Sequence, residues 1–162
     1  MRERKYRAFV KQCNKMIYSE NSYPKGNSDY RFVASEDHRK GLGVEYFTSR
    51  TEYVNQYGGV ILLPDWRVFT DEEAPVTEYT GLKDKNGRMI YEKDIAEESY
   101  INPMTGKKVV DRYVIEWENG LHKMKYIGNQ KGMDRYLWMR LDEIEIIGNV
   151  YQNPDLLLEA TK

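Results

Sequence analysis

The chain has 162 residues, enough for one core domain with an added element but few for two full domains. Its 25 lysine and arginine residues nearly balance its 26 aspartate and glutamate residues, so the net charge of -1 excludes a global attraction to nucleic acid or to an anionic membrane. The single cysteine excludes an internal disulfide, and two histidines are too few for a zinc site of the cysteine and histidine type.

Two features of the sequence bear on where the protein is located in the cell. The longest unbroken apolar run is Val60 to Leu63, whereas a membrane-spanning helix needs about 20 residues. The first residues are charged and do not resemble a signal peptide. We therefore expect a cytoplasmic protein that does not contact the membrane.

Residues 1–18 predict an N-terminal hairpin, because apolar and basic side chains alternate from Lys5 to Val10 and a turn-like stretch leads to Met16–Tyr18. Residues 1–15 have a net charge of +5 and residues 142–162 a net charge of -4, so the two ends could attract each other. We interpret the basic residues as the solvated positions of a strand. A basic arm that contacts phosphate is the alternative.

Residues 19–58 predict an irregular or partly helical insertion. Asn, Ser, Pro and Gly cluster between residues 21 and 28, and Gly58-Gly59 closes the segment. Ser35 with the acidic residues after it suits the first turn of a helix, but Gly41 and Gly43 would interrupt that helix at about 1 kcal/mol each.

Residues 59–152 predict a β-rich core. Val60 to Leu63 is typical of a short buried strand that Pro64 ends, and an apolar segment continues from Trp66 to Phe69. Fourteen tyrosines and three tryptophans also favour pleated, half-buried surfaces.

Asn119-Gly120 lies between two alternating runs, which predicts a hairpin with a two-residue type I′ turn. Pairing Glu118 with Leu121 sets Trp117 opposite His122 and Glu116 opposite Lys123. One face then forms the predicted core: Tyr113, Ile115, Trp117, His122, Met124 and Tyr126. Truncation of Trp117 is expected to cost the most, about 3 to 5 kcal/mol if the ring is buried.

Two further strands are predicted at Tyr136–Met139 and Glu143–Ile147, the second with Ile144 and Ile146 on one face. Residues 153–162 predict a short C-terminal helix that presents Leu156 to Leu158, with Asn153 as the N-cap and Pro154 at the first helical position.

Three stretches resemble the YopX-like family of phage and prophage proteins. YTGLKDKNGRMIYEKDI at 79–95 resembles the family signature, RKYRAFV at 4–10 its opening, and IEIIGNVYQNPDLL at 144–157 its ending. The chain departs from the family pattern at Lys93, where glycine is usual, and at Phe9, where tryptophan is usual.

This resemblance implies that residues 1–162 form a single mainly β domain, with a small SH3-like β-barrel core over residues 59–152. It also implies assembly into homo-oligomers and residence in phage or prophage genomes of a bacterial host. No catalytic residue is established for the family.

Two groups of residues that could bind a metal or act as acid and base are interpreted as ordinary structural features. If DKNG at 84–87 is aligned as a calcium loop on Gly87, Leu82 and Lys93 occupy the first and twelfth ligand positions, so we interpret it as an Asn-Gly turn. The neighbouring carboxylates Glu72 with Glu73, and Glu97 with Glu98, are expected on a solvated surface, because adjacent strand residues point to opposite faces.

His122 has no acid placed to orient it and is interpreted as structural, and Cys13 lies in a turn beside Lys11 and Lys15 with no histidine nearby in the sequence. Walker and dinucleotide-binding motifs are absent. We expect no catalytic, metal-binding or cofactor-binding residue, and therefore a protein that is not an enzyme.

The function that we favour is an accessory protein of phage or prophage origin that acts by binding, as a homo-oligomeric β scaffold contacting a protein of the host or phage. One alternative is a nucleic-acid-binding module that uses the basic N-terminal strand, with Arg4, Lys5 and Arg7, and exposed tyrosines. An uncharacterised enzyme is a second alternative.

Overall fold

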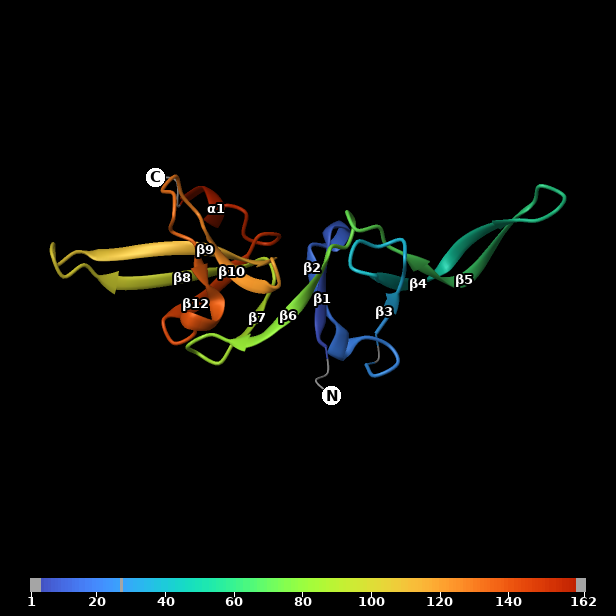
Figure 1. The fold of residues 1–162 in the computed structure, drawn as a ribbon. Helices are drawn as coiled ribbons and strands as arrows, with labels where there is room; N and C mark the ends of the chain where they lie inside the picture. The colour runs from blue at the N-terminus through green and yellow to red at the C-terminus, as the bar shows by residue number, and fades with distance from the viewer. Residues whose placement is uncertain (1–3, 27, 160–162) are drawn as a thin grey trace. The chain divides into compact units, whose positions relative to one another are not determined.

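The computed structural model describes residues 4–26 and 28–159 and is mainly β, as the sequence predicts (Figure 1). The chain divides into two compact units, Met1–Val76 and Thr77–Lys162. This division runs through the segment 59–152 that we predicted as one barrel core.

The predicted N-terminal hairpin is confirmed in the first unit. Strand β1 (Tyr6–Val10) pairs antiparallel with β2 (Lys15–Tyr18) through a short 3-10 turn, η1 (Lys11–Cys13). The expectation of a solvated basic face is wrong at Arg7, which is buried. The reason is that β1 has a neighbour on its other edge, where Phe9 N–H donates to Pro75 O at 3.2 Å.

The irregular insertion predicted for residues 19–58 is wrong over much of its length. A one-turn 3-10 helix, η2 (Ser19–Asn21), precedes β3 (Tyr30–Ala34) and the long strand β4 (Leu42–Val54). These strands join β5 (Val60–Val68) in a three-stranded antiparallel sheet of order β3-β4-β5. Aromatic and β-branched residues in both strands fit this outcome, which the glycine-rich turns between them concealed.

No helix begins at Ser35; residues 35–41 form a turn closed by a hydrogen bond from Ser35 N–H to Gly41 O at 3.0 Å. Buried His38 organises this turn, since its Nδ1 lies 2.8 Å from Ser35 Oγ and its Nε2 lies 2.8 Å from Phe69 O. Its ring occupies the space that a Cβ at Gly43 would need. The GLG segment therefore fits a structural histidine.

The core of the first unit lies between the hairpin and the inner face of the three-stranded sheet. Its buried members come from β1, β2, β4 and the segment before residue 77: Ala8, Val10, Ile17, Val44, Ala74 and Val76. Tyr46 stacks on Phe69 beside it, with ring centroids 4.4 Å apart.

The second unit contains the other strands. After β6 (Val76–Lys83), which pairs with β7 (Met89–Tyr91), come β8 (Asp94–Ile101), β9 (Lys108–Glu118), β10 (Leu121–Tyr126), β11 (Arg135–Tyr136) and β12 (Ile144–Asn149). The last five form an antiparallel sheet of order β11-β10-β9-β8-β12. The SH3-like character that the resemblance implies is not established by this order and stays a prediction.

The predicted register of the β9–β10 hairpin is confirmed at every pair from Glu118 with Leu121 to Tyr113 with Tyr126, and Asn119 and Gly120 both have positive φ. The predicted core face is correct away from the turn and wrong beside it. Tyr113, Ile115 and Met124 are buried, but Trp117 is 56% exposed, because it lies near the hairpin end.

Side chains on the opposite face pair diagonally. Lys123 Nζ lies 2.7 Å from Glu118, while Glu116 accepts from Lys93 at 2.7 Å, so the expected pair of Glu116 with Lys123 does not form an ion pair. The hydrogen bonds from Lys123, then Lys125, lower the pKa of Glu118 to about 2.

The strand predicted at Tyr136–Met139 is wrong, because after β11 the chain forms the 3-10 helix η3 (Leu137–Met139) with Leu137 buried. The strand predicted at Glu143–Ile147 corresponds to β12, where Ile144 and Ile146 are buried. The predicted C-terminal helix is present as α1 (Leu156–Glu159), and residues 160–162 of that prediction lie outside the described part. Asn153 does not cap it; its side chain accepts from Asn149 N–H at 3.2 Å.

The signature segment at 79–95 has a structural role. Buried Asp84 accepts from Asn86 and Arg88 N–H through one oxygen and from Ile146 N–H through the other, each at 2.9 Å. The Asn-Gly turn expected at 84–87 is therefore confirmed, and its carboxylate holds β12 in place. Lys93 keeps the conformation that favours glycine, with φ of 65°.

Candidate protein-binding surface

A two-stranded ribbon, the arm, extends from the sheet of the first unit (Figure 1). We define the arm as residues 47–66. Strand β3 pairs with β4 only over Leu42–Tyr46, whereas β4 and β5 stay paired out to Val54 with Val60. Beyond Phe47 the ribbon therefore has two strands and no third to cover it.

The register assigns the side chains of the arm to two faces. A bulge at residues 49 and 50 separates the pairs Thr48 with Asp65 and Thr51 with Leu63. The extra residue of the bulge is in β4, so side chains alternate without interruption along β5. Its odd-numbered side chains therefore lie on one face and its even-numbered side chains on the other.

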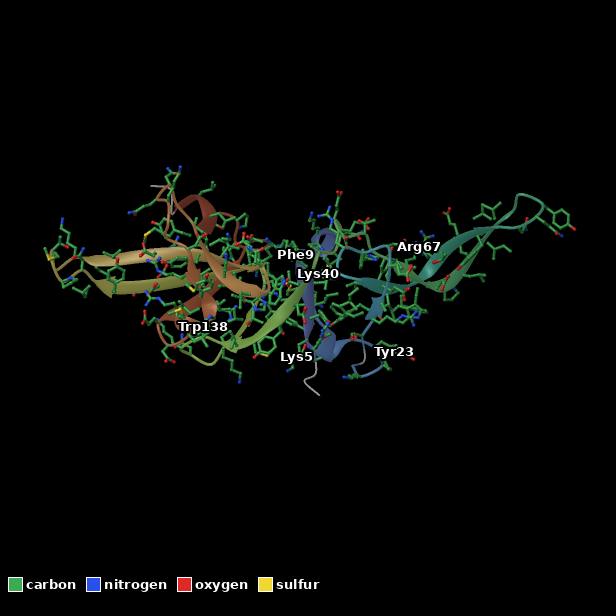
Figure 2. The ribbon with its side chains drawn as sticks, in the orientation of Figure 1. Lys5, Phe9, Tyr23, Lys40, Arg67 and Trp138 are labelled. Atoms are coloured by element: carbon green, nitrogen blue, oxygen red, sulfur yellow. The ribbon has the colours of Figure 1, made fainter. Side chains whose placement is uncertain are left out.

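The odd-numbered face is the inner one. Arg67, labelled in Figure 2, is paired with Tyr46, which packs beside the core of this unit. Further out, the Tyr53 hydroxyl donates to Asp65, and this hydrogen bond raises the pKa of Tyr53 and lowers the pKa of Asp65. Polar contacts thus occupy part of the inner face.

The outer face is mostly apolar. Its apolar side chains are Phe47, Val54, Val60, Leu62 and Trp66, Val68 adjoins them at the base, and Glu52 lies on the same face opposite Leu62. Val54 is 72% exposed, Val60 60% and Leu62 55%. Contiguous exposed apolar side chains of this kind mark interaction sites on proteins.

Aromatic contacts hold the base of the outer face. The ring of Trp66 lies 5.5 Å from that of Phe47 and 5.7 Å from that of Tyr23, between centroids. The Arg31 guanidinium lies 4.3 Å from the Trp66 centroid, and its Nε donates to Glu45 at 2.6 Å. Figure 2 labels Tyr23 at this end of the sheet. These contacts fix the Trp66 ring before any partner binds.

Strand β5 is one edge of this sheet, and Pro64 interrupts that edge. The hydrogen bonds from Asn55 N–H to Gly59 O and from Phe69 N–H to Val44 O show that odd-numbered residues of β5 point their backbone groups toward β4. The backbone groups of even-numbered residues point away from β4, toward the unpaired edge. Pro64 is even-numbered and has no N–H to donate at that edge. The free edge is therefore a poor template for an added strand.

Two predictions about β5 are corrected by this geometry. Val60 to Leu63 forms a strand but is exposed, and the strand does not end at Pro64 but runs on to Val68. Pro64 lies opposite the bulge of β4. It is tolerated because its nitrogen, which has no hydrogen to donate, points away from β4 toward the unpaired edge.

The residues singled out from the sequence lie in separate places. Cys13 is exposed in η1, with its Sγ 3.7 Å from Val10 O. His122 packs against Trp117 with ring centroids 4.6 Å apart, as expected for a structural histidine. Glu73 accepts from Thr70 N–H at 2.8 Å in the turn after β5. These groups do not form one site.

Glu97 and Glu98 point to opposite faces as expected, but Glu98 is not solvated. It is 4% exposed and lies 2.8 Å from Arg140, which also contacts Glu143 at 2.9 Å. Burial first, and then the hydrogen bond with Glu143, raise the pKa of Glu98. The Arg140 guanidinium engages both carboxylates, so we assign the cluster to the packing of η3 on the sheet.

Within residues 4–26 and 28–159, no three or more His, Cys, Asp and Glu side chains gather as metal ligands would. No helix of the described chain is long and apolar enough to cross a membrane. The arm is thus the feature that most calls for a partner. Sequence reasoning found its apolar run but placed it in a core, and Pro64 within a run of apolar residues was the available sign of an edge strand.

Comparisons with known proteins support the placement of the fold. The crystal structure of protein EF1440 from Enterococcus faecalis is similar, with 19% identity and a TM-score of 0.51 over 97% of this chain and 99% of that one. No curated protein matches significantly. The family described as YopX protein matches residues 5–158, nearly the whole chain, and the protein therefore belongs to the YopX family.

Proposed function

We propose that this protein is an accessory protein of phage or prophage origin that works in the bacterial cytoplasm by binding rather than by catalysis. It acts as a homo-oligomeric β scaffold that also contacts a protein of the host or phage. The observation that supports this proposal best is the exposed apolar outer face of the arm.

Physical arguments favour a protein as the partner of this face. A two-stranded ribbon alone in water is only marginally stable, so an arm that exposes valine, leucine and isoleucine gains from being covered. Its charged side chains are Arg50 and Glu52, together with Asp65 on the inner face. With both signs present and little net charge, the arm lacks the basic surface that nucleic acid would require.

The test is light scattering on size-separated protein at low and moderate salt, with and without a pool of single- and double-stranded oligonucleotides. We expect a discrete oligomer whose mass does not change with nucleic acid. A monomer that shifts with oligonucleotide at low salt would overturn the proposal. In that case neutralising Arg4 and Lys5 should abolish the shift.

A further inference from the structure

We infer that the outer face of the arm binds the outer face of the same arm in a second copy of this chain, the two arms lying antiparallel about a twofold axis level with the Thr51 and Leu63 pair. This inference rests on the proposed function and deepens it, because it names the partner of this one surface. The contact is between faces, with side chains packed between two ribbon layers about 10 Å apart.

The first argument is the interruption of the edge. Two copies could also associate by pairing their β5 edges, but Pro64 lies in the middle of that edge with no N–H to donate. Such pairing would lose hydrogen bonds at its centre in both copies. Face-to-face packing makes no demand on the backbone and covers the apolar side chains.

The second argument is the distribution of apolar side chains. A twofold axis level with the Thr51 and Leu63 pair places the Val54 and Val60 end of one arm over the Phe47 and Trp66 base of the other, because Val60 and Trp66 are each three residues from Leu63. The small, highly exposed valines then meet fixed aromatic rings. The apolar side chains of this face then meet apolar ones, so the surface is complementary to itself, as an isologous interface requires.

The third argument is charge complementarity. Arg50 and Glu52 flank Thr51 at the middle of β4, are both exposed, and form no ion pair with each other or with another residue in the described part of the chain. The alternation of side chains places both on the outer side. Antiparallel alignment about this point sets Arg50 of each copy against Glu52 of the other, so the charges match twice in one dimer.

The size of the face predicts a weak dimer. The seven residues of β5 in the arm, 60–66, span about 23 Å, and two strands with their side chains are about 10 Å wide, so each copy offers roughly 230 Å². A standard interface buries about 800 Å² on each partner. We therefore expect a weak dimer whose amount rises with the square of the monomer concentration, and the assay must reach high protein concentration.

The experiment is sedimentation equilibrium of the full chain and four variants. Leu62→Asp on the outer face should raise the dimer dissociation constant at least about tenfold. Ile61→Asp is the matched control, since Ile61 is the next residue, is 45% exposed against 55% for Leu62, and lies on the inner face. It should change the constant less than about threefold.

The charge test uses Arg50→Glu and the double variant Arg50→Glu with Glu52→Arg. The single variant should weaken the dimer, since it sets acid against acid at both contacts, and the double variant should restore it. These exposed positions keep the inference testable if Leu62→Asp does not fold, which circular dichroism will show.

Each outcome decides. An oligomer whose mass ignores Leu62→Asp and Arg50→Glu would overturn this inference and leave the proposed assembly standing. Equal weakening by Ile61→Asp would overturn the assignment of the outer face. A chain that stays monomeric throughout would remove both this inference and the homo-oligomeric part of the proposed function.

Discussion

Each unit has a two-stranded ribbon that runs beyond the strand covering it, and the two ribbons end in the same way. In the arm, Asn55 N–H donates to Gly59 O at 2.9 Å and Asn55 Oδ1 accepts from Tyr57 N–H at 2.9 Å. In the β8–β9 ribbon, Asn102 N–H donates to Lys107 O at 2.9 Å and its Oδ1 accepts from Met104 N–H at 2.8 Å.

The ribbons differ in their strands. The β8–β9 ribbon goes only three pairs beyond Glu98, and its outermost pair joins Ile101 to Lys108. Its root is polar and buried at Glu98 and Asp111, whereas the root of the arm is aromatic at Phe47 and Trp66. The two ribbons therefore share their asparagine-capped loop and differ in length and in the residues at their roots.

The largest expected effect breaks the support of the β8–β9 ribbon at its core. Strand β9 continues from this ribbon to Ile115, which is fully buried, and Ile115→Ala should cost about 3 kcal/mol of unfolding free energy. Trp117→Ala, two residues further on, is the control and should cost less than about 1 kcal/mol because the ring is exposed. Urea denaturation measures both, and a larger loss for Trp117 would contradict the burial described.

The next variant should destabilise the β8–β9 ribbon and leave the arm unchanged. Asp84→Asn replaces a carboxylate oxygen with an amide N–H that opposes the N–H of Ile146, and should cost about 2 to 3 kcal/mol. Because Asp84 holds β12, the strand that covers β8, hydrogen exchange should increase in β8 and β9. The amides of β4 and β5 should exchange as before, and equal acceleration there would show that the two ribbons are not independently supported.

The sequence predicts the strand register of the β9–β10 hairpin but not which of its side chains are buried. The Asn119-Gly120 turn specified a whole register, because a two-residue turn leaves one way to pair the strands. The depth of burial could not be derived. Trp117 and Met124 share a face, yet only Met124 is buried, since burial depends on η3 and β12, which come from distant parts of the chain.

The binding surface was missed for a related reason. Val60 to Leu63 has the composition of a buried strand, and composition cannot say whether a third strand covers it. The cover ends where β3 begins at Tyr30, which pairs with Tyr46, in a segment whose strands were not recognised from sequence. The structural role of His38 was missed as well: the two histidines were only judged too few for a zinc site, and its partner Phe69 lies 31 positions away.

A smaller effect tests the polar root of the β8–β9 ribbon. Since burial raises the pKa of Glu98, the folded chain binds this proton more readily than the unfolded chain, and acid favours folding at this site. The contribution is present below the unfolded pKa and is lost as pH rises through the folded pKa. Wild-type protein should gain stability relative to Glu98→Gln as pH falls from 7 toward the ordinary pKa of glutamate.

Urea denaturation across that pH range measures the difference. Glu97→Gln is the control, as Glu97 lies on the opposite face, 3.0 Å from Arg112. A difference between wild type and Glu98→Gln that stays constant with pH would show that the Glu98 carboxyl does not take up its proton in this range.

The smallest expected effect tests the shared loop. Asn55 Oδ1 accepts from both Tyr57 and Gly59 N–H, and Asn102 Oδ1 from Met104 N–H. Each lost hydrogen bond at an exposed loop is worth about 0.5 kcal/mol, so Asn55→Ala should lower the free energy of opening its ribbon end by about 1 kcal/mol and Asn102→Ala by about half as much.

Both losses are local, because a ribbon end can open without unfolding its unit. Hydrogen exchange at Tyr57 and Met104 is thus the measurement, and aspartate at either position, which keeps the acceptor, should leave exchange nearly unchanged. If alanine at position 55 had no effect in dilute protein but its ribbon became protected at high concentration, the arm would owe its order to the second copy rather than to its loop.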